Sequence, residues 1–207
     1  VLIEMYATFG ALEESHRVFL GLSAKNSLSW TSLIIGYAQN CCRNESIALF
    51  MMMQEENVML SKVNLPNAFK TCGNVCDLRL GRLFHDHVIR SVFESDANIA
   101  CSLVDMYAKG NSIEEARKVF DMIENLNEAI WSVMIGGYAL NGNSHSAIEL
   151  FEKLRGKGVE VNKGIVLGVV RACSNLGLIQ SGMWMHDQIA RTMFEAEIDI
   201  ASTLIDM

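Results

Sequence analysis

The sequence predicts an all-α fold, an α-solenoid of stacked antiparallel helical hairpins. Three observations lead to this prediction: the sequence repeats itself every 101 residues, apolar residues recur at helical spacing, and turn residues separate the helical segments. Half of the 207 residues are hydrophobic and only 20% are charged, so the chain can bury a core. Because one helical hairpin cannot bury its apolar stripe alone, its neighbours must stack on it.

The repeat is visible in a phrase that returns along the chain. The segment LIEMYA at 2–7 returns as LVDMYA at 103–108 and begins again as LIDM at 204–207, each time 101 residues later. The register also holds between these marks, where the equivalent pairs include Trp30 with Trp131, Cys72 with Cys173, and Gly81 with Gly182. An unbroken register over two periods indicates a repeat architecture.

Each period divides into three hairpin units of 35, 35 and 31 residues. The units are 1–26 (partial), 27–61, 62–96, 97–127, 128–162, 163–197 and 198–207 (partial). In unit 27–61, apolar residues step by three and four through two successive segments, as in amphipathic helices. The turns between paired helices are expected at Gly10, Cys41, Cys76, Asn111, Gly142 and Gly177, and four of these six are Gly or Asn, which favour a left-handed helix end. The run 164–170 has a strand-like composition, but the register requires a helix there.

Four phrases resemble a known family. SWTSLIIGYAQN (29–40), SLVDMYAKGNSIEEARKVFD (102–121), AIWSVMIGGYALNG (129–142) and RACSNLGLIQSGMWMHDQIA (171–190) look like pentatricopeptide repeats of the plant type. In that type, motifs named P, L and S alternate. The resemblance covers the whole chain in the order partial S, P, L, S, P, L, partial S, and it implies a right-handed superhelix.

The resemblance implies binding of single-stranded RNA, about one base per repeat. The base would be read by a small polar residue near the start of each first helix, together with the last residue of the motif. The implied reading pairs are Thr31 with Ser61, Cys101 with Asn127, and Ser132 with Asn162, while Asn26 and Ser202 are halves of truncated pairs. Ser132 with Asn162 matches the family combination that favours adenine. A thiol is a weak hydrogen-bonding group, so Cys101 should discriminate poorly.

Other positions carry further implied roles. Leu28 and Ala129 match the aliphatic positions that separate neighbouring bases, and Lys109 matches a basic position near the phosphates. The ordinary alternative stays open for the polar residues, because Ser, Thr and Asn at helix starts are common N-caps.

The net charge of −7 is an objection to nucleic-acid binding, since phosphate neutralisation usually supplies much of the affinity. No unit carries a basic block, however, and many acidic residues are expected on second helices, away from the binding groove. We therefore expect base-edge hydrogen bonding and stacking to dominate, with a shallow salt dependence.

By resemblance, such proteins act in mitochondria or chloroplasts and specify C-to-U RNA editing or other RNA processing. Their partners would be single-stranded RNA and editing-complex proteins or a deaminase domain, in the same chain or in another. The sequence starts without Met and stops inside an apolar pattern, so we interpret it as an internal window that lacks any targeting signal. Two alternatives remain: a helical-repeat scaffold that binds proteins, and a decayed fragment that folds without binding tightly.

We expect no enzymatic activity, no cofactor and no metal in this window. Cys72, Cys76, His85 and His87 superficially resemble a zinc cluster, but the register spreads them over a first helix, a turn and a second helix. No phosphate-binding glycine loop, dinucleotide fingerprint or zinc-deaminase motif is present. No apolar run reaches the roughly 18–20 residues that a membrane-spanning helix needs, so no membrane association is expected.

Overall fold

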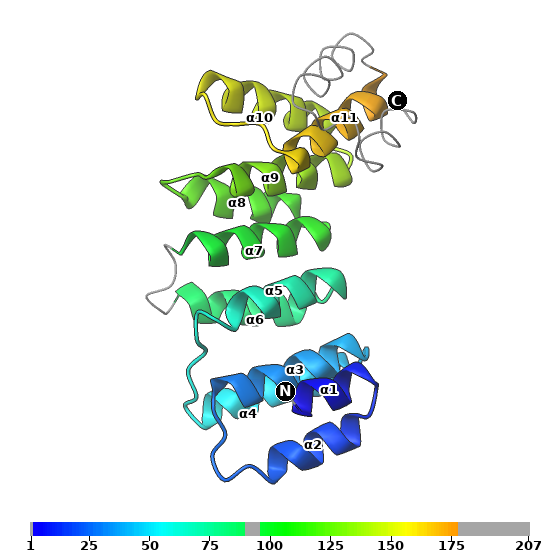
Figure 1. Cartoon of the computed structure of the whole chain (residues 1–207), viewed down its shortest axis with the longest axis vertical. Helices are drawn as coiled ribbons and strands as arrows, with labels where there is room; N and C mark the ends of the chain where they lie inside the picture. The colour runs from blue at the N-terminus through cyan, green and yellow to red at the C-terminus, as the bar shows by residue number, and fades with distance from the viewer. Residues whose placement is uncertain (1, 90–95, 178–207) are drawn as a thin grey trace. The chain divides into compact units, whose positions relative to one another are not determined.

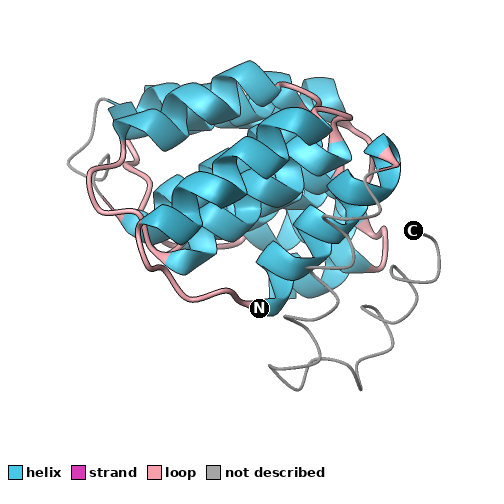
Figure 2. Ribbon diagram, turned by 90° about the horizontal axis from the view of Figure 1, so that it is seen from above, coloured by secondary structure: helices cyan, strands magenta, loops and turns pink. Residues whose placement is uncertain are grey.

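The computed structural model describes residues 2–89 and 96–177, where all regular structure is helical. The helices in this part of the chain are α1 (Leu2–Thr8), α2 (Leu12–Leu20), α3 (Ser27–Gln39), α4 (Arg43–Glu55), α5 (Leu65–Asn74), α6 (Leu78–Ile89), α7 (Ala97–Lys109), α8 (Ile113–Met122), α9 (Glu128–Leu140), α10 (Ser144–Gly156) and α11 (Lys163–Leu176). Figure 1 labels them, and Figure 2 colours every described regular element as a helix. The all-α prediction is confirmed.

The chain divides into two compact units, residues 1–106 and 107–207. In the first unit, consecutive helices pair as hairpins, α3 packs against both α1 and α5, and α4 packs against α6. First helices therefore line up beside first helices, and second helices beside second helices. In the second unit, α9 packs against α8, α10 and α11 in the same manner. Each unit by itself is a stack of helical hairpins, as the solenoid prediction requires.

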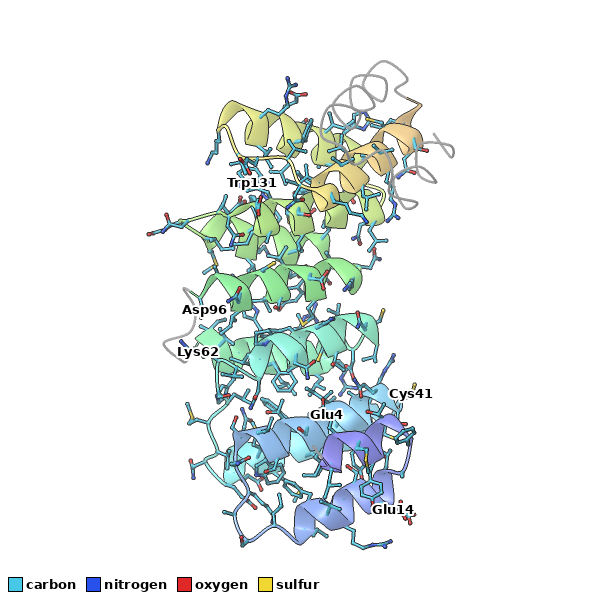
Figure 3. All side chains as sticks on the ribbon, viewed as in Figure 1. Glu4, Glu14, Cys41, Lys62, Asp96 and Trp131 are labelled. Atoms are coloured by element: carbon cyan, nitrogen blue, oxygen red, sulfur yellow. The ribbon has the colours of Figure 1, made fainter. Side chains whose placement is uncertain are left out.

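The turns between paired helices lie where the sequence predicts them. All six expected positions have left-handed backbone, with φ from +52° at Cys76 to +75° at Gly10 and Gly142. Cys41, at φ +62°, occupies the exposed turn between α3 and α4 (Figure 3). A left-handed residue at this place closes the last helical turn and lets the chain reverse direction.

The 101-residue repeat also appears as a repeated contact between neighbouring hairpins. Phe19 of α2 meets Trp30 of α3 edge to face, with ring centroids 4.6 Å apart. One period later, Phe120 of α8 meets Trp131 of α9 at 5.2 Å (Figure 3 labels Trp131). Both tryptophans are buried. In each unit, therefore, a second helix is joined to the first helix of the following hairpin by the same aromatic pair.

Asparagine side chains tie successive first helices together. Asn141 Nδ2 donates to the carbonyl oxygens of Ala108 and Gly137, both at 2.8 Å, and Asn40 makes the same two bonds one period earlier. The helices come close at these places because a glycine faces an alanine. A Cβ on Gly137 would lie 2.8 Å from the Ala108 Cβ, which is well inside normal carbon–carbon contact.

Two helix starts test the register directly. The strand-like run 164–170 lies inside α11, as the repeat predicts. In unit 62–96, by contrast, the first helix begins at Leu65 instead of at the start of the unit. Pro66 explains this difference, because proline lacks an N–H and is favoured in the first turn of a helix. Within the described ranges, no helix combines the length and the apolarity needed to cross a membrane.

Candidate functional site

Three asparagines among the predicted base-reading residues are the N-caps of first helices. Asn26, Asn127 and Asn162 have extended backbone, and each Oδ1 accepts a hydrogen bond from the backbone N–H three residues later, at 2.9, 3.0 and 3.0 Å. The N-cap alternative is thus confirmed for all three. Capping uses only the Oδ1 atom of each side chain, because the Nδ2 group of each asparagine forms no hydrogen bond within the described part of the structure. Capping fixes the amide and leaves its donor group available.

The structure brings Ser132 and Asn162 together at the start of α11. Ser132 lies one turn into α9 and is half-buried. A Cβ built on Gly164 would overlap the Ser132 hydroxyl and would lie 3.5 Å from Asn162 Oδ1. Both side chains therefore border the same small space beside Gly164. The Ser132 hydroxyl has no hydrogen-bond partner among the described residues.

The equivalent pair in unit 27–61 is arranged differently. Thr31 is only 2% exposed, and its hydroxyl donates to the Ser27 carbonyl at 2.7 Å. The Ser61 N–H donates to Ser27 Oγ at 3.0 Å, and Asn64 Nδ2 donates to the same oxygen at 3.3 Å. Ser27 thus links Thr31 to Ser61, and the hydroxyl of Thr31 is already occupied by the protein itself. The reading role of Thr31 and Ser61 stays a prediction.

The third pair is divided between the two compact units, with Cys101 in the first and Asn127 in the second, and its reading role stays a prediction. Cys101 is half-buried in α7, and burial, followed by the nearby Asp105 carboxylate, raises the pKa of its thiol. Burial thus favours the neutral thiol, which is a weak hydrogen-bonding group, and the weak discrimination expected of Cys101 stays a prediction. Ser202 and the partial unit 198–207 lie outside the described residues.

The two predicted base-separating residues are exposed in the first turns of their helices. Leu28 in α3 is 54% exposed, and Ala129 in α9 is also exposed. Exposure of an aliphatic side chain at a helix start leaves it able to contact a ligand. Lys109, predicted to contact phosphate, is the last residue of α7 and is half-buried.

Local charge at the helix starts is mixed despite the net charge of −7. Lys25 precedes the Asn26 cap, and its ammonium lies 5.2 Å from the centroid of the Phe19 ring. Lys163 follows the Asn162 cap, whereas Glu128 follows the Asn127 cap. The caps therefore have cationic neighbours at two of three places, and helix N-termini themselves favour anions.

Sequence reasoning did not single out Ser27 or Gly164. Ser27 is the first residue of its unit, and only the tertiary structure shows that it accepts hydrogen bonds from Ser61, at the end of the same unit, and from Asn64 in the next. Gly164 is the second residue of its unit, in the place that Leu28 and Ala129 take in theirs. Glycine is a poor helix former, so its presence in a predicted helix is the one sequence signal that marks this position.

The apparent zinc cluster takes the places that the register assigns to it. Cys72 is buried in α5, Cys76 lies in the following turn, and His85 and His87 lie in α6. No group of three or more potential metal ligands gathers within residues 2–89 and 96–177. Burial, with the Asp77 carboxylate as a second cause, raises the pKa of the Cys72 thiol far above its usual value.

Comparisons with known proteins agree with this geometry. The family model described as PPR repeat matches residues 28–58, 100–127 and 129–159. A pentatricopeptide repeat-containing protein of Arabidopsis thaliana is 39% identical over 178 residues, which are 86% of this chain and 25% of that protein. A mitochondrial pentatricopeptide repeat-containing protein of the same plant is 32% identical over 206 residues, 100% of this chain and 23% of the relative. The chain thus spans about a quarter of the length of these curated relatives.

Solved structures share the fold. The crystal structure of the pentatricopeptide repeat protein PPR10 from maize has a TM-score of 0.74 at 16% identity, over 98% of this chain and 30% of that chain. PPR10 in complex with an 18-nucleotide psaJ RNA element has a TM-score of 0.67 at 15% identity, over 98% of this chain and 31% of that chain. The hairpin stack, the three matched repeats and the similar relatives lead to one conclusion: the chain belongs to the pentatricopeptide repeat family.

Proposed function

We propose that this chain binds single-stranded RNA and reads bases at the starts of its first helices, without transforming the RNA itself. The observation that carries the proposal is the pairing, beside Gly164, of the Ser132 hydroxyl with Asn162, whose Oδ1 caps the helix while its Nδ2 group makes no hydrogen bond among the described residues. Two uncommitted polar groups at one helix start can recognise the edge of a base. The RNA complex of PPR10, a protein of similar fold, supports this use of the architecture.

The chemistry of the pair favours adenine. Capping holds Asn162 Oδ1 on the Ile165 N–H at 3.0 Å, so the Nδ2 donor is the part of the amide left for a base. The Ser132 hydroxyl can both donate and accept. The Watson–Crick edge of adenine offers one acceptor, N1, and one donor, the N6 amino group, and so matches a donor beside an acceptor. The corresponding ring nitrogen of guanine carries a hydrogen and would oppose the Asn162 amide.

The neighbouring residues fit the same proposal. The exposed Leu28 and Ala129 would separate successive bases through apolar contact, and Lys109 would lie near a phosphate. Because the chain carries a net charge of −7, few phosphates would be neutralised. With about two phosphate contacts, the logarithm of the affinity should fall with the logarithm of salt at a slope of only about −1.4.

The finer assignments are parts of this proposal. The unit boundaries and the alternation of P, L and S motifs follow the 35, 35 and 31 residue spacing. The naming of one relative as mitochondrial supports an organelle, mitochondrion or chloroplast, as the place of action. Within such an organelle, we propose that the array specifies sites for C-to-U editing or for other RNA processing, with editing-complex proteins or a deaminase domain in the same or another chain.

Selection from randomised single-stranded RNA tests the proposal. The chain should enrich an adenine at one register, and Ser132→Ala/Asn162→Ala should abolish that enrichment. One lost base contact is worth about 1–3 kcal/mol, so the preference should fall by roughly 5- to 150-fold. Asn143→Ala is the matched control, because Asn143 precedes the second helix α10 and its side chain makes no capping bond.

Two results would argue against RNA reading. No enrichment at low salt would refute the proposal, and co-purification of a protein that resists ribonuclease would favour the scaffold alternative. Enrichment that survives the double substitution would leave RNA binding intact but would move the reading site elsewhere.

A further inference from the structure

Thr31 in unit 27–61 and Ser132 in unit 128–162 occupy the same place in the 101-residue repeat. Their hydroxyl groups nevertheless differ in hydrogen bonding. Thr31 is 2% exposed and its hydroxyl donates to the carbonyl of Ser27, four residues earlier. Ser132, its counterpart, is half-buried and makes no such bond within the described residues. Serine and threonine hydroxyls in helices often donate to that preceding carbonyl. The freedom of Ser132 therefore requires a cause.

Gly164 supplies the space that the Ser132 hydroxyl occupies. A Cβ at position 164 would overlap that hydroxyl oxygen, while it would lie 3.5 Å from the Ser132 Cβ. The first contact is a steric conflict and the second is ordinary van der Waals contact. One period earlier the same place is taken by Val63, which is 78% exposed. The glycine is thus found where the hydroxyl is free, and a side chain is found where the hydroxyl is bound to its own helix.

We propose that Gly164 is a positioning residue for base selection, which keeps the Ser132 hydroxyl turned toward the Asn162 cap. The inference rests on the proposed RNA binding. It makes unit 128–162 the selective position of the chain, and it makes unit 27–61 a weak reader because the Thr31 hydroxyl is already bound to the Ser27 carbonyl.

A methyl group added at position 164 changes the hydrogen bonding of Ser132. In Gly164→Ala the new Cβ displaces the Ser132 hydroxyl from its present rotamer. The available alternative is the bond that Thr31 makes, to the carbonyl four residues earlier, which for Ser132 belongs to Glu128. The Ser132 hydroxyl would then donate its hydrogen bond to the Glu128 carbonyl and would turn away from Asn162.

The experiment compares the affinity of the full chain for RNAs that differ at one base. One set varies the base that faces unit 128–162, and a second set varies the base three nucleotides away, which faces unit 27–61. The unsubstituted chain should prefer adenine at the first position by at least about fivefold, and it should discriminate by less than about twofold at the second. Gly164→Ala should reduce the first preference to below about twofold and leave the affinity for a guanine at that position nearly unchanged.

Gly156→Ala is the matched control. It also adds one methyl group to a helix of the same compact unit, but nothing lies within 4 Å of its Cβ position. This variant should keep the full adenine preference. A second comparison places Gly164→Ala in a Ser132→Ala background, where the hydroxyl is already absent. There the additional methyl group should have no further effect on the preference.

The outcomes separate this inference from the proposed function. A Gly164→Ala chain that still prefers adenine overturns the inference alone, as does an equal effect of the substitution with and without the Ser132 hydroxyl. Absence of RNA binding by the unsubstituted chain overturns both. If Gly164→Ala fails to fold, recovery of folding in the double variant supports the steric overlap, and continued unfolding refutes it.

Discussion

The close approach of α9 to the end of α7 gives a sharp test of the fold, because two adjacent glycines of α9 have opposite surroundings. Nothing lies within 4 Å of a Cβ on Gly136, whereas a Cβ on Gly137 would lie 2.8 Å from Ala108 Cβ and 3.5 Å from Ile113 Cδ1. Alanine is favoured over glycine inside a helix by about 0.8–1.0 kcal/mol. Gly136→Ala should therefore stabilise the chain by up to about 1 kcal/mol.

Gly137→Ala gains the same free energy from helix propensity, but its packing costs exceed that gain. The new methyl group must push α9 away from Ala108, and overpacking of this kind costs about 1–3 kcal/mol. The displacement also lengthens the 2.8 Å hydrogen bond from Asn141 to the Ala108 carbonyl, which is worth about 0.5–1.5 kcal/mol. We expect a net destabilisation of about 1–3 kcal/mol.

Equilibrium unfolding in urea, followed by helical circular dichroism, measures both variants against the unsubstituted chain. The difference between two neighbouring Gly→Ala variants removes most effects on the unfolded state, which are shared. Equal stability of the two variants would show that α7 and α9 do not meet closely at this residue, and the reasoning about the asparagine and glycine contacts would fail with it.

Three further predictions concern single side chains and are read from the free energy of unfolding. Asn141→Ala should cost about 1–3 kcal/mol, because it removes two hydrogen bonds of 2.8 Å, while Asn143→Ala, at a helix start without a side-chain cap, should cost less than about 0.5 kcal/mol. Asn26→Ala should cost about 1 kcal/mol, since it opens the capping box of α3; an unchanged midpoint would contradict that cap. Burial and the Asp77 carboxylate raise the pKa of Cys72 in the fold, so its contribution to stability is present below the unfolded thiol pKa of about 8.5 and declines as the pH rises above it. Cys72→Val should weaken that decline, and an identical alkaline profile would refute it.

The helical architecture could be predicted from the sequence because its causes are local. Steps of three and four between apolar residues indicate a helix whatever surrounds it, and the left-handed turn at Asn111 follows from the short polar side chain that tolerates positive φ. The repeat register then placed Cys72 in a helix and the run 164–170 in α11, although their compositions suggest other roles. Pro66 shifted one helix start by a few residues, as proline does.

The candidate site was predictable only in part. The repeat register and the family resemblance predicted the positions of Ser132, Asn162 and Thr31. The preference of asparagine for helix N-caps predicted the caps that the structure contains. They could not show which hydroxyl is free. The Thr31 hydroxyl donates to the carbonyl four residues earlier, as serine and threonine in helices can. The space beside the Ser132 hydroxyl, by contrast, is left by Gly164, more than thirty positions along the chain.

By itself, therefore, the sequence determined the elements of this protein, their order and the family they belong to, because helical periodicity and a 101-residue repeat are properties of the chain read along its length. Only the tertiary structure decided that the Thr31 hydroxyl is hydrogen-bonded within its helix while the Ser132 hydroxyl is not, and that α9 approaches Ala108 at Gly137. The physical reason is that hydrogen bonding and steric exclusion act over a few ångströms in space, and a difference of one methyl group decides them without changing the pattern from which the fold is predicted.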